Sequence, residues 1–212
     1  FKRPLYLRMM WNSLIITIPV LIGQLLLAPL AAYGFWQCRW KYKEILFYLY
    51  MIVMLMPLQL TLVPNYLVAN WLGIQNSSLA IILPAIGSPF LIFFFKQNAY
   101  SFPKDTLEAA RMDGLNEYQI FFKIFMPMMK STYAAAGIFM FMASWNNYMW
   151  PLIALQSDTK FTLPLVVANL ASGFTPDYGM TMVGIVLSTL PTIIVFFTLQ
   201  KSFVEGMTGS VK

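Results

Sequence analysis

The sequence contains no histidine, a single cysteine and few charged residues. Without histidine or a second cysteine, the chain has no disulfide framework, no His-based metal site and no His-containing catalytic triad. We assign no role to Cys38, because a lone cysteine is most often chemically inert. Charged residues form 10% of the chain and hydrophobic residues 59%, whereas roughly a quarter of a soluble domain is charged. This composition predicts a membrane protein.

Several chemistries lack their sequence signatures. There is no GxxxxGK[ST] phosphate loop, no GxSxG nucleophile elbow and no pair of carboxylates within an apolar stretch. We therefore expect no enzyme activity and no bound metal or cofactor in this chain itself. The net charge of +6 could attract nucleic acid. However, the basic residues are spread among loops beside apolar stretches, which favours membrane topology and no nucleic-acid partner.

Five apolar stretches approach or exceed the length of about 20 residues that a bilayer span requires. None of them contains Asp, Glu, Lys or Arg, and they cover residues 12–36, 45–69, 79–95, 132–155 and 180–200. The chain is therefore predicted to be an all-α, polytopic helical bundle that forms one transmembrane domain over residues 1–212.

Prolines interrupt several of these stretches: Pro19, Pro29, Pro57, Pro64, Pro84, Pro89 and Pro191. Each removes a backbone donor, which a membrane tolerates only where neighbouring helices or a water-filled cavity satisfy the freed carbonyl. The second span also carries Gln59, Thr61 and Asn65, so it is the best candidate for an irregular helix that lines a transport pathway. Ordinary packing kinks are the alternative interpretation.

The distribution of lysine and arginine predicts the orientation of the chain. Ten of the 14 lie in residues 37–44, residues 96–131 and the C-terminal tail, and the other four lie in the N-terminal segment and at Lys160. By the positive-inside rule, the first set is cytoplasmic. This orientation places Phe1 and three nearby basic residues outside. We therefore expect one more span upstream of Phe1.

Residues 103–130 form the one long polar interruption, with four of the eight acidic residues. Asp105 with Glu108, and Asn116 with Gln119, match the capping-box pattern, so this stretch is predicted to contain two short helices.

Asp113-Gly114 supplies a glycine for the left-handed turn that ends the first of these helices, and Pro127 closes the second. The apolar face of the pair needs a covering partner, which we expect to be another protein. That face comprises Leu107, Ala110, Leu115, Ile120, Phe121 and Ile124.

The same stretch resembles the EAA loop of permease subunits in bacterial ATP-binding-cassette (ABC) importers. The matching residues are Glu108-Ala109-Ala110, Gly114, Ile124 and Pro127, with Met126 in place of the usual leucine. Three further segments resemble the carbohydrate-importer branch, in particular its smaller maltose-type permease subunits: MPLQLTLVPNYL, WNNYMWPL at 145–152 and the tail FVEGMTGSVK. A bare Glu-Ala-Ala is common on helix surfaces, so the specificity comes from the ordered spacing of four segments.

The resemblance implies the type I ABC importer permease fold in the bacterial plasma (inner) membrane, with this chain forming half of the pathway of an ATP-driven sugar importer. It also implies three kinds of partner: a second homologous permease, two cytoplasmic ATPase subunits that bind ATP and Mg, and an extracytoplasmic solute-binding protein. The residues agree, because no predicted span holds an ionisable group to couple transport to an ion. The alternative is an ATP-independent channel or facilitator for small neutral solutes.

The resemblance assigns the first helix of residues 103–130 as a coupling helix that docks in a cleft of an ATPase subunit. The implied coupling residues are Glu108, Ala109, Ala110, Arg111, Asp113, Gly114, Ile124 and Pro127. The glutamate offers its carboxylate to a basic group, the two alanines allow close approach and the glycine makes the turn. The arginine and the aspartate are rim charges, and the last two residues pack the second helix against the bundle. The alternative for Glu108 is a solvated surface charge.

A neutral sugar pathway needs amides for hydroxyl groups and flat rings for the apolar faces of the sugar. The candidates are Gln59, Asn65, Trp145, Asn146, Asn147, Tyr148 and Trp150. Alternatively, the tryptophans form an interfacial aromatic belt and the asparagines bond to neighbouring helices.

Two further features concern packing and the outer surface. Gly184 and Ser188 lie four residues apart and predict a close helix contact, because small residues let helices approach. The connection 156–179 is too short to span the membrane, so we expect it to lie at the membrane–water interface or to form a lid on the external side. The resemblance implies that this connection contacts the solute-binding protein.

Overall fold

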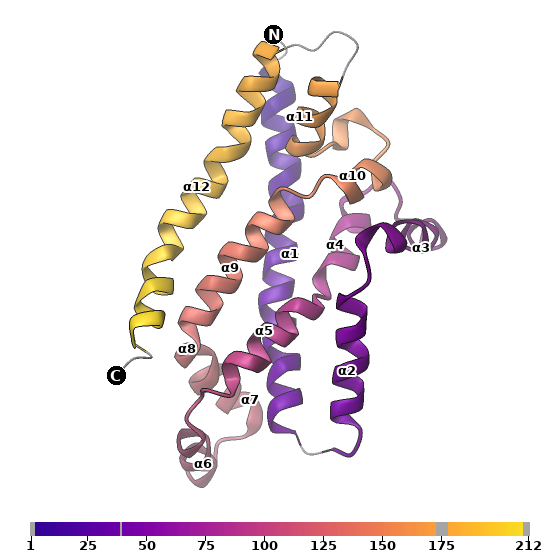
Figure 1. Cartoon of the computed structure of the whole chain (residues 1–212). Helices are drawn as coiled ribbons and strands as arrows, with labels where there is room; N and C mark the ends of the chain where they lie inside the picture. The colour runs from indigo at the N-terminus through magenta and orange to yellow at the C-terminus, as the bar shows by residue number, and fades with distance from the viewer. Residues whose placement is uncertain (1–2, 39, 173–177, 210–212) are drawn as a thin grey trace. The chain divides into compact units, whose positions relative to one another are not determined.

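A computed structural model describes residues 3–38, 40–172 and 178–209 (Figure 1). Within those ranges every regular element is a helix, and turns or loops connect the helices. It divides into two compact units. Unit 1 comprises Phe1–Gly23, Met56–Gly87 and Ile138–Thr198. Unit 2 comprises Gln24–Leu55, Ser88–Gly137 and Leu199–Lys212.

Three helical segments are long and apolar enough to cross a membrane. They are Tyr6–Gln37 within α1 (Arg3–Gln37), Ser78–Ala99, which joins α4 (Ser78–Ile86) to α5 (Pro89–Ala99), and Tyr178–Lys201 within α12 (Tyr178–Gly209). Two bent helix pairs also pass the same test, which gives up to five spans. The five predicted apolar stretches correspond to these five segments.

The second predicted span is irregular, as its prolines indicate. It consists of α2 (Lys43–Met54) and α3 (Leu58–Trp71), which meet at an angle of 100°. Pro57 occupies the N-cap of α3, where its missing N–H removes no helical hydrogen bond. The other bent pair, Glu117–Met128 with Lys130–Ala154, meets at 77°. By contrast, Pro191 lies inside the continuous helix α12.

Unit 1 has two hydrophobic clusters. One surrounds Trp150 of α10 (Met149–Ala154) and includes Ile81 of α4. The other surrounds Trp145, the last residue of α9 (Lys130–Trp145), and includes Leu163. Leu163 begins α11 (Leu163–Ser172), which follows the short 3₁₀ helix η2 (Asp158–Lys160). The predicted connection 156–179 therefore contains a helix that packs into the core of unit 1, while its residues 173–177 lie outside the described ranges.

Asn76 joins two loops of unit 1. Its backbone is left-handed, with φ of 53°, a conformation that asparagine adopts more readily than most residues. The Asn76 Oδ1 accepts hydrogen bonds from the backbone N–H groups of Gln156 and Ser157, at 3.1 and 3.2 Å. One side chain thus connects the α3–α4 loop to the loop after α10.

Unit 2 contains a buried charge that the sequence analysis placed in a connection. Lys96 lies in α5, inside the segment Ser78–Ala99, and is only 2% exposed. Its Nζ is 3.2 Å from Glu44 Oε2 in the first turn of α2 and 3.5 Å from the ring centroid of Phe47. The prediction that the spans contain no ionisable group is therefore wrong, because this segment extends beyond residue 95 and includes Lys96. The glutamate balances this charge close to the ends of both helices.

Candidate functional site

The polar stretch 103–130 forms four short helical elements in unit 2. They are α6 (Lys104–Met112), α7 (Glu117–Ile120), the π-helix η1 (Phe121–Phe125) and α8 (Met126–Met128). Pro103 is the N-cap of α6, and no side chain caps this end. The predicted Asp105–Glu108 capping box is therefore wrong, because Asp105 already lies in the first turn. There its carboxylate still complements the positive end of the helix dipole.

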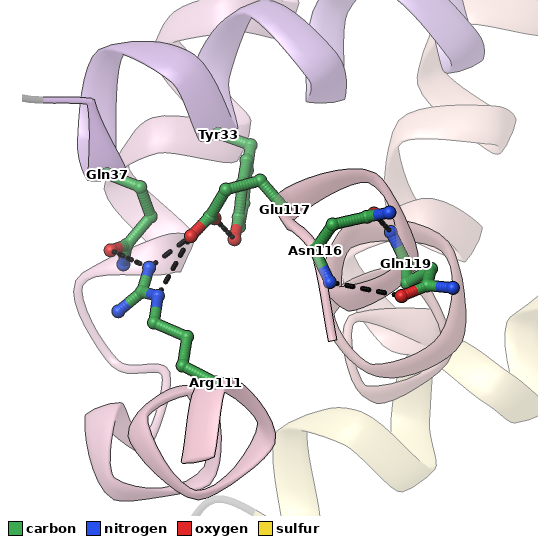
Figure 2. A network of polar contacts seen from close by, with 6 residues as sticks. All are labelled: Tyr33, Gln37, Arg111, Asn116, Glu117 and Gln119. Atoms are coloured by element: carbon green, nitrogen blue, oxygen red, sulfur yellow. Dashed lines mark hydrogen bonds and ion pairs between the residues drawn. The ribbon is translucent and has the colours of Figure 1, made fainter. Parts of the chain in front are cut away.

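The second predicted capping box is confirmed. The Asn116 Oδ1 accepts a hydrogen bond from the Gln119 N–H at 2.9 Å, and the Asn116 N–H donates to Gln119 Oε1 at 3.0 Å (Figure 2). These reciprocal bonds satisfy two donors that the start of a helix would otherwise leave without partners. They fix the point at which α7 begins.

Gly114 makes the turn between α6 and α7, as predicted. Its φ is +82°, and the next residue, Leu115, donates its N–H to the carbonyl of Ala110 at 3.1 Å. This arrangement is a left-handed termination, in which glycine avoids the clash of a Cβ with the backbone.

Replacement of Gly114 by alanine is expected to cost about 1 kcal/mol of stability, because an L side chain is strained at positive φ. No heavy atom lies within 4 Å of the added Cβ, so backbone strain is the only cost. Gly34→Ala in α1 is the matched control, since its Cβ also meets open space and alanine favours a helix. Thermal unfolding of the detergent-solubilised protein measures both variants. Equal stability of the two would contradict this reading of the turn.

Pro127 does not end its helix as predicted, because the helix continues to Met128. The five residues before α8 form the π-helix η1. A proline ring clashes with the carbonyl four residues earlier, which belongs to Lys123 inside this wider turn. The bend of 77° follows at Met129.

The apolar face of the loop is covered by the chain itself, so the expectation of a protein partner for that face is wrong. The ring of Tyr33 in α1 lies 5.5 Å from Phe121 and 5.0 Å from Phe125, centroid to centroid. Four members of the predicted face are buried, namely Leu107, Ala110, Ile120 and Phe121, and so is the neighbouring Phe125. Pro127 is exposed and Ile124 only half-buried. The second helix is therefore anchored mainly by its phenylalanines.

A polar network joins the loop to the end of α1 (Figure 2). The Tyr33 hydroxyl donates to Glu117 Oε2 at 2.6 Å, and the Arg111 Nε–H donates to Glu117 Oε1 at 2.8 Å. Arg111 also donates from Nη2 to Gln37 Oε1 at 3.2 Å. The hydrogen bond to Glu117 raises the pKa of the Arg111 guanidinium above its ordinary value, so this group stays charged. Arg111 thus bridges three elements of the chain, and its place at the rim of an ATPase contact stays a prediction.

The outer surface of α6 carries the remaining predicted residues. Glu108, Ala109 and Asp113 are exposed, whereas Ala110 is 3% exposed and packs inward. Only the first of the two alanines is therefore open to a partner. Met112 is 88% exposed, and the sequence analysis missed it. Its spacing of four residues from Glu108 was the available signal, because such residues share one helix face.

The pathway candidates in unit 1 are divided by burial. Trp145 is 1% exposed and donates its Nε1–H to the Ser188 carbonyl at 2.9 Å. Trp150 donates to the Ala80 carbonyl at 2.9 Å. Neither indole is open to a solute in this structure. The other candidates are exposed or half-buried: Gln59, Asn65, Asn146, Asn147 and Tyr148. The Asn146 amide donates to the Met142 carbonyl of its own helix.

Trp150→Phe is expected to destabilise the protein by about 2 kcal/mol, since it leaves the buried Ala80 carbonyl without its donor and opens a small void. Sugar selectivity of the remaining folded protein should not change. Thermal unfolding and an uptake assay with a panel of sugars measure the two effects. A shift in selectivity with unchanged stability would instead make Trp150 a pathway residue.

The family and the relatives that this chain matches are all membrane components of transport systems. Residues 6–209 match the family described as binding-protein-dependent transport system inner membrane component. The lactose transport system permease protein LacG of Rhizobium radiobacter is 46% identical over 202 residues, which is 95% of this chain and 74% of LacG. The arabinooligosaccharides transport system permease protein AraQ of Bacillus subtilis is 38% identical over 209 residues, covering 98% of this chain and 74% of AraQ.

Two solved structures share the fold. One is a bacterial ABC transporter involved in the import of the acidic polysaccharide alginate, with a TM-score of 0.83 and 24% identity over 95% of this chain and 76% of that chain. The other is the inward-facing MetNI methionine ABC transporter, with a TM-score of 0.70 and 15% identity, covering 95% of this chain and 97% of that chain. At these identities the likeness describes the fold alone.

Proposed function

Because this chain belongs to the family of binding-protein-dependent transport system inner membrane components, we propose that it is a permease subunit of an ATP-driven sugar importer. The observation that carries the proposal is the similarity, over nearly the whole chain, to permeases named for lactose and arabinooligosaccharides. The exposed and half-buried amides on α3 and after α9 supply hydroxyl-binding groups without a net charge, which suits a neutral sugar. These groups are Gln59, Asn65, Asn146 and Asn147, with Tyr148 as the accompanying ring.

In this proposal, α6 is the coupling helix and lies on the cytoplasmic side. Its outer face, formed by Glu108, Ala109 and Met112, docks in a cleft of an ATPase subunit. The methionine enters an apolar recess and the carboxylate meets a basic group. Met112 is 88% exposed on this face, so its side chain is available for the contact. Gly114 sets the angle between α6 and α7, and Asp113 borders the contact.

The network around Glu117 can transmit a movement of the docked helix α6 to α1. The network links α6 and α7 to Tyr33 and Gln37 at the end of α1. The aromatic packing of Phe121 and Phe125 on Tyr33 joins the same elements through buried surface. A displacement of α6 by the ATPase is therefore passed to α1 without a flexible segment between them. ATP-driven closure of the ATPases then alternates the access of the pathway.

The proposed assembly contains this chain, a second homologous permease, two cytoplasmic ATPase subunits that hold ATP and Mg, and an extracytoplasmic solute-binding protein. Its place is the bacterial inner membrane. The exposed apolar side chains of α12, among them Val186, Ile194 and Phe197, suit contact with lipid or with the second permease.

Reconstitution tests the proposal. The chain is purified together with an ATPase, a second permease and a binding protein from the same organism, and the complex is placed in liposomes with ATP inside or outside. We expect labelled lactose or an arabinooligosaccharide to accumulate only when ATP is on the ATPase side and the binding protein is on the other. Equilibration of sugar by this chain without the ATPase would contradict the proposal and favour a facilitator.

A further inference from the structure

A pocket in unit 2 carries basic side chains that the coupling role does not use. Its volume is about 210 Å³, and its walls include Trp36, Lys43, Lys104, Glu108 and Arg111. Three of these five side chains are cationic and one is anionic, so the lining is positively charged overall. We call this cavity the basic pocket. From its charge and its position we propose that it binds the phosphate of an anionic phospholipid headgroup.

The lysines of the basic pocket are the groups available to a phosphate. Lys43 lies 4.0 Å from Glu44, at the limit of an ion pair, and the other oxygen of that carboxylate is 3.2 Å from Lys96. Lys104 makes no ion pair with any residue that the structure describes. Arg111 is already engaged by Glu117. A phosphate would give Lys104 a charge-assisted partner, and it would give Lys43 a closer one than Glu44 at 4.0 Å.

The position of the pocket selects a lipid as the source of this phosphate. Trp36 lies in the last turn of α1, and Lys43 is the first residue of α2, so the pocket forms where two apolar helices end. Tryptophan and lysine are typical of this depth, because their polar ends reach the headgroups while their apolar parts stay in the membrane. Basic pockets between helix ends are known to hold anionic headgroups.

The surface of α2 provides a path for the acyl chains. Leu46 and Met54 follow Lys43 at spacings of three and eleven residues, which place them on its side of α2, and they are 45% and 43% exposed. A lipid with its tails on these residues has its headgroup at the level of Lys43. Such a lipid is held by both ends, which a free phosphate ion is not.

The basic pocket and the proposed ATPase contact use different sides of α6. Lys104, Leu107 and Arg111 line the pocket and recur at helical spacing, whereas Ala109 and Met112 are exposed beside it. Glu108 lies at the border of both. Lipid binding is therefore compatible with docking and does not depend on it.

Native mass spectrometry of the purified transporter complex without nucleotide tests the proposal. Phosphatidylglycerol is titrated against the wild type and against a Lys43→Gln, Lys104→Gln double variant. The double variant should bind roughly thirtyfold more weakly, since each basic residue near an anionic lipid increases the affinity by a factor of about five. Lys43→Arg with Lys104→Arg should retain binding. The control Lys123→Gln, Lys130→Gln removes two exposed charges elsewhere in the same loop and should bind as the wild type does.

Two competition experiments distinguish a lipid headgroup from a free phosphate ion. Phosphatidylcholine, which has no net charge, should compete poorly, and inorganic phosphate alone should not displace phosphatidylglycerol. Equal affinity of the wild type and the glutamine double variant would overturn the proposal. So would displacement by phosphate, or chemical cross-linking of Lys104 to a carboxylate of the ATPase. Binding is read without transport, so an importer that fails to move sugar but binds the lipid contradicts only the proposed function.

Discussion

Glu108→Lys is expected to reduce ATP-driven sugar uptake at least about a hundredfold, while the complex still assembles. The side chain is exposed on the outer face of α6, so the substitution removes no packing within this chain. In the proposed cleft it replaces a favourable charge pair by two like charges, and such a juxtaposition costs several kcal/mol. Because 2.7 kcal/mol corresponds to roughly a hundredfold, loss of this one contact is sufficient to uncouple the transporter.

Two further variants locate the cause of that loss. Glu108→Gln keeps the size and removes only the charge, so its uptake should fall by about tenfold, between the wild type and the lysine variant. Lys130→Glu reverses an exposed charge at the start of α9 and should leave uptake within about twofold of the wild type, as most surface substitutions do. Uptake and nucleotide hydrolysis are measured in the same vesicles. Normal uptake by Glu108→Lys would remove Glu108 from the ATPase contact.

Local sequence was sufficient to predict the spans, but it did not predict where every helix begins. The five segments follow from apolar length alone, and the break in the second span follows from Pro57. Two capping-box patterns, however, had different outcomes. Asn116 is an N-cap, whereas Asp105 is not, because the N-cap is Pro103 and the helix begins at Lys104. The pattern indicates that a helix starts nearby, and the backbone before it decides at which residue.

Contacts between distant residues could not be predicted from the sequence. Tyr33 and Glu117 are 84 positions apart, and Lys96 and Glu44 are 52 apart. No spacing rule links such residues, so the burial of a lysine inside a span and the covered apolar face of the loop became visible only in the fold. The position of Arg111 within the polar network also depends on a distant residue, because Gln37 lies 74 positions away.

The tryptophans illustrate a chemical ambiguity. An indole N–H near an amide suits a sugar hydroxyl as well as it suits a backbone carbonyl. The carbonyls that accept these bonds belong to Ser188 and Ala80, which are 43 and 70 positions away in the sequence. Asn146 and Asn147 stay at least partly exposed, so they remain candidates for the proposed pathway.

The close contact predicted at Gly184 gives the largest expected effect on stability. A Cβ at this position in α12 would lie 2.7 Å from Val167 Cγ2 and 3.3 Å from Tyr6 Cε1. The first distance is shorter than carbon atoms tolerate, and Tyr6 is held in place by its hydrogen bond to the Met180 carbonyl at 2.8 Å. Gly184→Ala should therefore destabilise the protein by about 2 kcal/mol, and Gly184→Val by about 3 kcal/mol, through overpacking.

A double-mutant cycle identifies the atom responsible. Val167→Ala removes the methyl group that a new Cβ would meet, so Gly184→Ala should cost less than about 1 kcal/mol in that background, with a coupling free energy of at least 1 kcal/mol. Gly137→Ala in α9 is the matched control, because its nearest neighbour, Leu199 Cδ1, is 3.5 Å away, an ordinary contact. That control should be neutral or slightly stabilising, since alanine favours a helix over glycine. Thermal unfolding followed by tryptophan fluorescence measures the four proteins of the cycle and the control. If Gly184→Ala costs the same with and without the Val167 methyl groups, the close approach of α12 to α11 is not what limits this position.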